Sequence, residues 1–107
     1  MPKSLEVSVL LIEEDDKRWS AQCLEYDIVA QADTLKDLRY EVEKTLLAYI
    51  VLDEESEGRV LKELGKAPQK YWDMYESSDL AVEPRKELFQ PVGGLQRRPK
   101  PQFRVAA

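Results

Sequence analysis

Residues Arg18–Leu52, RWSAQCLEYDIVAQADTLKDLRYEVEKTLLAYIVL, decide the fold because they combine two strand patterns with one long amphipathic helix pattern. Trp19, Ala21 and Cys23 alternate with polar residues, which is typical of a strand with one packed face. Residues 27–32, DIVAQA, predict a second strand, whose small alanines leave room for a helix above it.

A long helix is predicted to follow Thr34, because Thr34 and Asp37 form a pair that resembles a capping box. Apolar residues then recur at the spacing of a helix with one buried face: Leu35, Leu38, Val42, Leu46, Tyr49 and Ile50. The acidic run 53–55 opposes the dipole at a helix C-terminus, so we expect the helix to fray there. Gly58 can then supply a left-handed stop.

The residues on both sides extend this arrangement. Residues 4–14, SLEVSVLLIEE, predict a strand that is buried on one face throughout and on both faces near its end. A helical turn or two is expected over 59–64, and a short helix is expected at about 69–77, after Pro68. Residues 102–106 are a candidate strand, and the prolines and glycines of 84–101 predict mostly irregular structure or an ordered arm.

The predicted fold class is therefore α+β. It comprises a three-stranded antiparallel β-sheet packed by one long helix, a candidate fourth strand at the C-terminus, a short helix and an extended C-terminal arm. We expect residues 1–58 to form the sheet-and-helix core and residues 59–107 to form a wrapping or docking segment. At 107 residues, the chain has the size of one domain.

Composition excludes several classes of function. The chain has no histidine, which removes Ser-His and Cys-His nucleophile pairs and the usual zinc sites. It also has no phosphate-binding glycine motif, so we expect no cofactor. The acidic run 13–16 could in principle hold Mg²⁺, but consecutive turn residues point in different directions, and we predict no catalytic or metal-binding residue.

Location and redox state follow from two further features. No run approaches the roughly 18–20 apolar residues of a membrane helix. The N-terminal residues MPKSLEV show no apolar signal region, which favours the cytoplasm. Cys23 is the only cysteine, so we expect no intrachain disulfide and a buried free thiol.

Two surfaces are candidates for binding a partner. Residues 1–84 carry a net charge of −10 and residues 85–107 a net charge of +5, so the basic tail either binds phosphate locally or lies across the acidic body of its own or a neighbouring subunit. The aromatic residues of the short helix either anchor an interface or fold back onto the sheet or main helix. The candidate partner-binding residues are Tyr71, Trp72, Tyr75, Arg97, Arg98, Lys100 and Arg104.

The opening stretch also resembles the N-terminal domain of the HicB family of antitoxins over about residues 5–50, under half of the chain. The resemblance rests on WSAQCLE at 19–25, IVAQA at 28–32, and Thr34-Leu35 opening the helix. It implies a partial RNase H-like sheet with a helix on one face, a further strand after the helix, and protein–protein contact as the mode of action. It also implies a small HicA-like toxin as a partner and assembly as a homodimer or a higher homo-oligomer.

The chain departs from the family pattern in two places. Residues 25–27 are Glu-Tyr-Asp, where family members often carry proline, glycine and cysteine residues. Ala32 and Asp33 stand where family members often have a glycine before the helix. Residues 59–107 match neither a helix-turn-helix nor a ribbon-helix-helix domain, so we expect a solitary HicB-like domain without operator binding. The centre of the first strand, VSVLLI at 7–12, has no acidic residue for a nuclease metal site.

The leading hypothesis from the sequence is a HicB-like, antitoxin-like protein-binding module that is not an enzyme. The first alternative is an RNA- or DNA-binding adaptor that uses the basic C-terminal arm. A metal-dependent nuclease is the least favoured interpretation.

Overall fold

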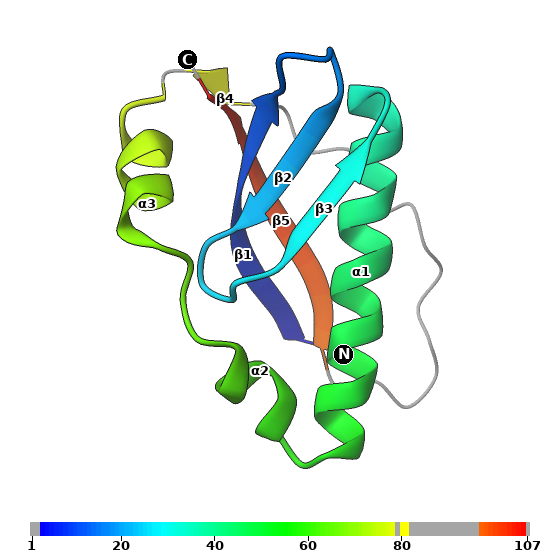
Figure 1. Ribbon diagram of the computed structural model, residues 1–107. Coiled ribbons are helices and arrows are strands. Elements are labelled where there is room, and N and C mark those ends of the chain that lie inside the picture. The colour runs from blue at the N-terminus through cyan, green and yellow to red at the C-terminus, as the bar shows by residue number, and fades with distance from the viewer. Residues whose placement is uncertain (1–2, 79, 82–96, 107) are drawn as a thin grey trace.

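The computed structural model describes residues 3–78, 80–81 and 97–106 (Figure 1). The strands are β1 (Lys3–Glu13), β2 (Trp19–Cys23), β3 (Val29–Ala32), β4 (Leu80–Ala81) and β5 (Arg97–Val105). The helices are α1 (Leu35–Glu55), α2 (Arg59–Leu64) and α3 (Gln69–Glu76). The α+β class predicted from the sequence is confirmed, including a strand after the long helix.

The strands form one sheet in the order β3-β2-β1-β5-β4. β1 pairs antiparallel with β2, with Val9 opposite Cys23, and β2 pairs antiparallel with β3. On its other side β1 pairs in parallel with β5, with Val9 opposite Phe103. The three helices lie between β3 and the strands on the far side of β1 in the chain. The sheet is mixed, because β5 runs parallel to β1 whereas the first three strands are antiparallel.

The C-terminal strand is longer than the sequence predicted. It begins at Arg97 instead of residue 102, because Pro99 and Pro101 are accommodated inside it. The part of the proline- and glycine-rich segment that spans 82–96 lies outside the described residues.

α1 covers one face of the sheet and builds the core with it. Thr34 caps the helix as predicted, since its hydroxyl oxygen accepts a hydrogen bond from the Asp37 N–H at 3.1 Å. Beneath it lies the core, whose buried members are Val7, Val9, Leu11, Ala21, Cys23, Ile28, Leu38, Val42, Leu46 and Phe103. Burial of each large apolar side chain here contributes about 1.5–3 kcal/mol.

β1 lies in the middle of the sheet. It is buried on both faces in the part where consecutive residues are all apolar. Val7, Val9 and Leu11 face α1, and Leu10 is fully buried on the opposite face. α3 lies on that opposite face, because its Tyr75 ring contacts the Arg104 side chain while neighbouring Phe103 faces α1. The sheet is therefore covered by α1 on one side and partly by α3 on the other.

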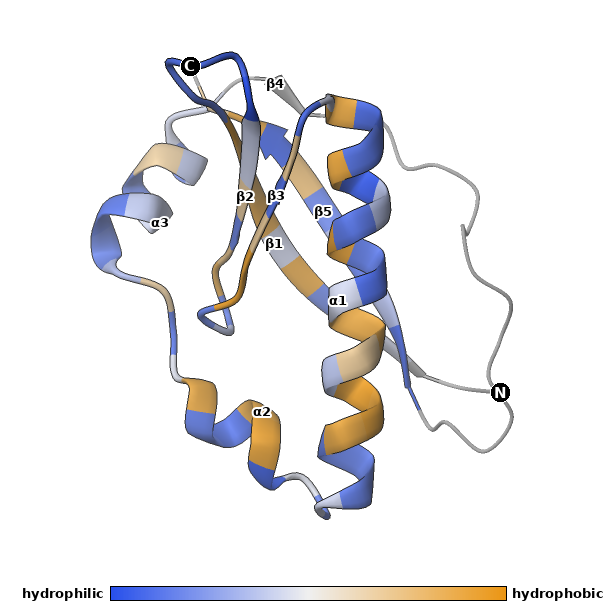
Figure 2. Cartoon of the chain, turned by 45° about the vertical axis from the view of Figure 1, so that its right-hand side comes forward, coloured by the Kyte–Doolittle hydropathy of each residue, from blue (hydrophilic) through white to orange (hydrophobic). Residues whose placement is uncertain are grey.

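The end of α1 differs from the sequence expectation. The helix does not fray at 53–55 but continues to Glu55, because the Asp53 side chain is buried and paired. Gly58 has the left-handed conformation predicted for it, with φ of 86°, and α2 follows directly. Figure 2 shows apolar residues on α2 and on the C-terminal half of α1, and Leu61 of α2 is buried. Within the described ranges, no helix has the length and apolar character needed to cross a membrane.

Candidate functional site

The basic residues of β5 divide between the two faces of the sheet. Arg97 is six positions before Phe103 on the same strand, so their side chains share one face of the sheet, the face covered by α1. There its Nη2 lies 2.6 Å from Asp53 Oδ2, and its Nε lies 3.6 Å from Glu54 Oε1. The ion pair joins the beginning of β5 to the end of α1, across 44 positions of the chain.

The Asp53 carboxylate is held by two groups at once. Besides Arg97, its Oδ1 accepts a hydrogen bond from the backbone N–H of Leu61 in α2 at 2.8 Å. Burial alone would raise the pKa of the Asp53 carboxyl, but the Arg97 guanidinium and the backbone N–H groups outweigh it and lower the pKa below its ordinary value of 3.8. The same contact raises the pKa of Arg97. Asp53 therefore remains a carboxylate at neutral pH.

The other basic residues of β5 also contact their own chain. Lys100 Nζ lies 3.7 Å from Glu6 Oε1 on β1, although both side chains are more than half exposed. Arg104 donates to the Tyr75 carbonyl at 3.0 Å and lies 4.5 Å over the Tyr75 ring. Arg98 is half-buried opposite Ser4 of β1. For residues 97–106, the basic tail thus lies across the body of its own chain, one of the two interpretations of the sequence.

The aromatic residues of α3 are all half-buried, and Tyr75 among them contacts the sheet. Trp72 Nε1 donates to the Ala67 carbonyl at 3.2 Å, and the Tyr75 hydroxyl donates to the Gln102 carbonyl at 3.1 Å. Tyr71 lies under the Lys70 ammonium group, 4.9 Å from it. These contacts favour a packing role for α3 over that of a fully exposed anchor.

The structure does not gather the predicted partner-binding residues into one patch. It brings Tyr75 and Arg104 together on the α3 face of the sheet. Arg97 lies seven residues earlier on β5, about 23 Å away at 3.3 Å per residue, and on the opposite face.

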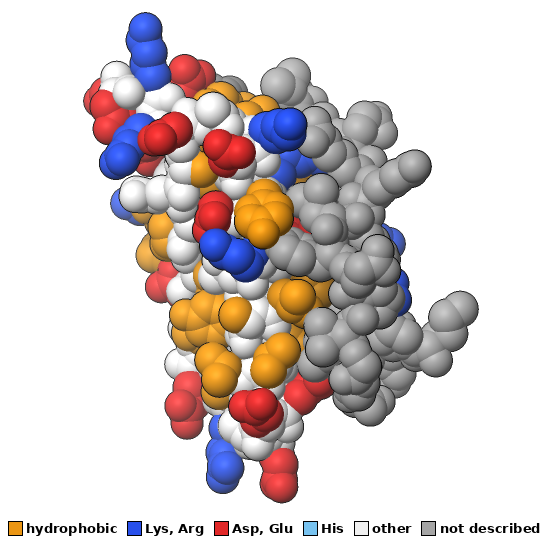
Figure 3. Space-filling view, turned by 90° about the vertical axis from the view of Figure 1, so that its right-hand side faces the viewer, with side chains coloured by type: hydrophobic (Ala, Val, Ile, Leu, Met, Phe, Trp, Pro, Cys, Tyr) orange, Lys and Arg blue, Asp and Glu red, His pale blue; other side chains and the backbone are white. Residues whose placement is uncertain are grey.

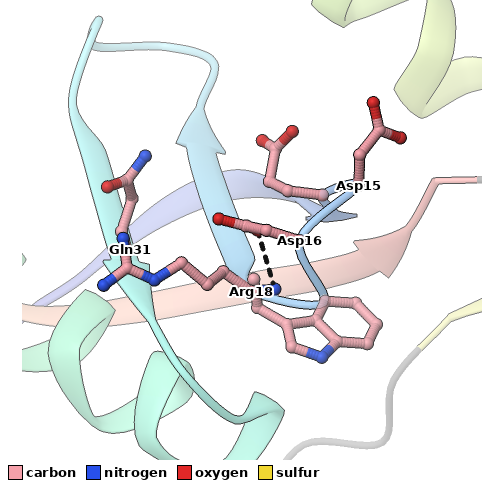
Figure 4. Close-up of a pocket in the computed structure, with 6 residues that line it drawn as sticks. Asp15, Asp16, Arg18 and Gln31 are labelled. Atoms are coloured by element: carbon pink, nitrogen blue, oxygen red, sulfur yellow. Dashed lines mark hydrogen bonds between the residues drawn. The ribbon is translucent and has the colours of Figure 1, made fainter.

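The acidic turn between β1 and β2 is open to solvent. Glu14, Asp15, Asp16, Arg18, Trp19 and Gln31 line a shallow depression there. Asp15 and Asp16 point in different directions, and the Arg18 backbone N–H donates to Asp16 Oδ1 at 3.1 Å (Figure 4). Among the described residues, no group of three or more His, Cys, Asp or Glu side chains is arranged to hold a metal ion.

Two polar contacts, one buried and one half-buried, were missed from the sequence. Asp53 is three residues after Ile50 and seven after Leu46, so its position on the buried stripe of α1 could have been detected from periodicity. Glu25 accepts hydrogen bonds from both the backbone N–H and the hydroxyl of Ser8, at 2.6 and 2.8 Å. No local pattern in the sequence signals this second contact.

Cys23 is a buried free thiol, as expected. Burial, together with the nearby Glu25 carboxylate, raises the pKa of the thiol from 9.0 to about 12. A nucleophilic cysteine needs a thiolate, so Cys23 is suited to packing and not to chemistry.

β3 is an outermost strand of the sheet, and no described strand pairs with its outer side. Val29 is 55% exposed, and Gln31 is also exposed. Asp27 and Asp33, both exposed, flank the strand.

Searches of protein-family models, curated proteins and solved structures found no match to this chain. Function must therefore be inferred from the residues themselves and from the surfaces that the fold presents. Among the described residues, the open surfaces include the outer edge of β3, the acidic β1–β2 turn and the outward face of α1.

Proposed function

We propose that the protein is a HicB-like, antitoxin-like module that acts by binding another protein and catalyses no reaction. The observation that carries the proposal is the arrangement of its elements. Three antiparallel strands, a long helix and a later strand beside β1 agree with the fold implied by the resemblance over residues 5–50. The cytoplasm is the proposed location, where a lone reduced thiol such as Cys23 is common.

The proposed partner is a small HicA-like toxin, and co-expression with a neighbouring toxin-like reading frame tests it. We expect the full chain to restore growth of cells expressing that toxin and to co-purify with it. A Leu46→Asp variant is the control, because a charge in the core should abolish folding and rescue together. Persistent toxicity with no co-purification, from a chain shown to be folded, would contradict the proposal.

The alternative is nucleic-acid binding through the basic arm, and it is less well supported. Arg97, Lys100 and Arg104 all contact groups of their own chain, so binding phosphates would require them to exchange these contacts. A gel shift at low salt distinguishes the two functions. Phosphate binding must weaken steeply as salt rises and must disappear when Arg97, Arg98, Lys100 and Arg104 are replaced by alanine.

We further propose that the protein assembles as a homodimer or a higher homo-oligomer. Figure 3 shows apolar side chains gathered on the face presented by α1, and Tyr40 and Leu52 of this helix are 45% and 51% exposed. Light scattering on the full chain tests the assembly. A single species with the monomer mass of 12.4 kDa at high micromolar concentration would contradict it.

A further inference from the structure

The outer side of β3 presents unpaired backbone groups in a regular row. The Cys23 N–H donates to the Ile28 carbonyl at 2.9 Å, so these two residues form a hydrogen-bonded pair across β2 and β3. Such pairs alternate along an antiparallel ladder, so Ala30 and Ala32 also direct their backbone groups at β2. The N–H and C=O groups of Val29 and Gln31 therefore point outward. No described strand pairs with them.

The opposite side of the sheet is far less suited to accepting a strand. The Ala106 N–H donates to the Leu11 carbonyl, which directs the N–H groups of even-numbered β5 residues toward β1. The odd-numbered positions turned outward include Pro99 and Pro101, which have no N–H to donate. β4 then pairs with the last part of β5, at Arg104 and Val105. Proline and a covering strand are common ways to protect a sheet edge, and β3 has neither within Val29–Ala32.

The side chains along β3 specify what kind of strand would fit. Ala30 and Ala32 pack toward the α1 side and are small, while Val29 and Gln31 project from the other face and are exposed. Acidic residues stand at both ends of the strand, Asp27 before it and Asp33 after it. Asp33 forms an ion pair with Arg18 Nε at 3.4 Å, but both side chains are mostly exposed, so a basic residue of a partner can compete for this carboxylate. The Asp27 carboxylate accepts one hydrogen bond from the Gln22 amide and keeps its charge. The acidic turn residues Asp15 and Asp16 lie near the Asp33 end, because they share a depression with Gln31 (Figure 4).

These charges argue against a second copy of the chain at this edge. Two β3 strands paired antiparallel about Ala30 would bring Asp27 of each copy toward Asp33 of the other, and like charges facing each other across a ladder are destabilising. A strand with basic residues at its ends would instead be attracted to Asp27 and Asp33.

We propose that the outer edge of β3 is the docking site for an extended segment of a partner protein, which adds to the sheet as a strand and carries Lys or Arg at both ends. The segment exchanges backbone hydrogen bonds with Val29 and Gln31 and places a small or β-branched apolar side chain beside Val29. Its basic side chains face the exposed carboxylates of Asp27 and Asp33, while the Asp27 N–H keeps its hydrogen bond to the Gly65 carbonyl at 3.0 Å. This inference rests on the proposed protein-binding function and names the surface that would serve it.

The test uses the full chain and a synthetic cyclic hairpin peptide whose free strand reads Lys-Thr-Val-Thr-Val-Thr-Lys. Cyclisation preorganises the strand and so reduces the entropy lost on binding. We expect titration, followed by amide chemical shifts, to move the signals of Val29, Ala30 and Gln31 in a saturable manner. We expect a peptide methylated on the two amide nitrogens that would face Val29 and Gln31 to produce no such shifts.

The charge requirement is tested with a matched pair of variants. Asp33→Lys should raise the dissociation constant roughly two- to fivefold, the scale of an exposed ion pair. Glu76→Lys makes the same change of charge on the exposed surface of α3, which contacts β5, separated from β3 by two strands, and should leave the constant unchanged. Because exposed ion pairs are screened, added salt should weaken peptide binding to the unmodified chain as well.

Several results would overturn the docking site: no binding at millimolar peptide, shifts confined to other elements, or equal binding of the methylated peptide. Concentration-dependent broadening of the β3 amides in the protein alone would also overturn it, because a second copy would then occupy the edge. If the chain fails the peptide test but still rescues toxin-expressing cells, the proposed antitoxin function is supported and only the β3 docking site is rejected. Peptide binding without rescue or co-purification would support the edge and count against the antitoxin role.

Discussion

Asp53 is the residue on which three elements depend. Its carboxylate belongs to α1, accepts the Leu61 N–H of α2, and pairs with Arg97 at the beginning of β5. The carboxylate is almost completely buried, whereas the Arg97 side chain is 27% exposed. Among the described residues, removing the charge of Asp53 would leave the partly buried guanidinium with the more distant Glu54 as its acidic partner.

We predict that Asp53→Asn lowers the free energy of unfolding by about 2–4 kcal/mol, near or below the range for breaking a buried ion pair. Urea denaturation measures the change. Glu55→Gln is the matched control, because Glu55 is an exposed acid in the same helical turn and its replacement should change stability by less than about 0.5 kcal/mol. Equal effects of the two substitutions would show that the ion pair does not stabilise the fold.

The same residue predicts a pH dependence. The folded pKa of Asp53 is lowered, so an unfolded chain takes up a proton at this carboxyl at a higher pH than the folded chain. The stabilisation from Asp53 should therefore be complete above pH 3.8 and should decline as pH falls through the folded pKa. We expect denaturation curves of the unmodified chain and of Asp53→Asn to converge at low pH. Curves that stay equally separated at low pH would contradict the assignment.

At the scale of the elements, α1 is defined by its cap and by its buried stripe. The Thr34 hydroxyl satisfies the Asp37 N–H, and Leu38, Val42, Leu46 and Ile50 supply the face that packs on the sheet. Both features are local in the sequence, which is why the beginning of this helix could be predicted. Its end could not be predicted, because Arg97, which holds Asp53 in the last turn, is distant in the chain.

We predict that Thr34→Ala destabilises the protein by about 1 kcal/mol, since it removes the side chain that caps α1. Thr34→Ser retains the hydroxyl at a position where serine caps at least as well as threonine, so it should leave stability nearly unchanged. Thermal or urea unfolding of both variants provides the comparison. If serine were as destabilising as alanine, the methyl group of Thr34 and not its hydroxyl would be the important feature.

On the scale of the whole molecule, β5 decides whether the sheet is complete. It pairs with β1 from Lys3–Arg97 to Leu11–Val105 and brings Phe103 into the core beside Val9. The expected core of residues 1–58 therefore contains β1 but lacks the strand on one of its sides. The loss of Phe103 alone corresponds to about 3–5 kcal/mol, against a total stability of about 5–15 kcal/mol for a typical domain.

We accordingly predict that a fragment of residues 1–58 does not unfold cooperatively, because one edge of β1 and the core beneath Phe103 would be exposed. Circular dichroism during heating should show a gradual loss of signal, in contrast to a sigmoidal transition for the full chain. Addition of a synthetic peptide of residues 97–107 should restore part of the transition. A fragment as cooperative as the full chain would show that β5 is an accessory strand.

The local sequence by itself determined the three N-terminal strands, the cap and buried face of α1, the left-handed Gly58 and the burial of Cys23, because alternation, helical period and turn chemistry act over a few residues. Only the tertiary structure decided that β5 lies parallel to β1, that Arg97 meets Asp53, and that the predicted binding residues lie on two faces. The open edge of β3 likewise depends on which strands take the other places in the sheet. Such pairings join residues tens of positions apart, and their free energy comes from burial and charge contacts that exist only once the chain has closed.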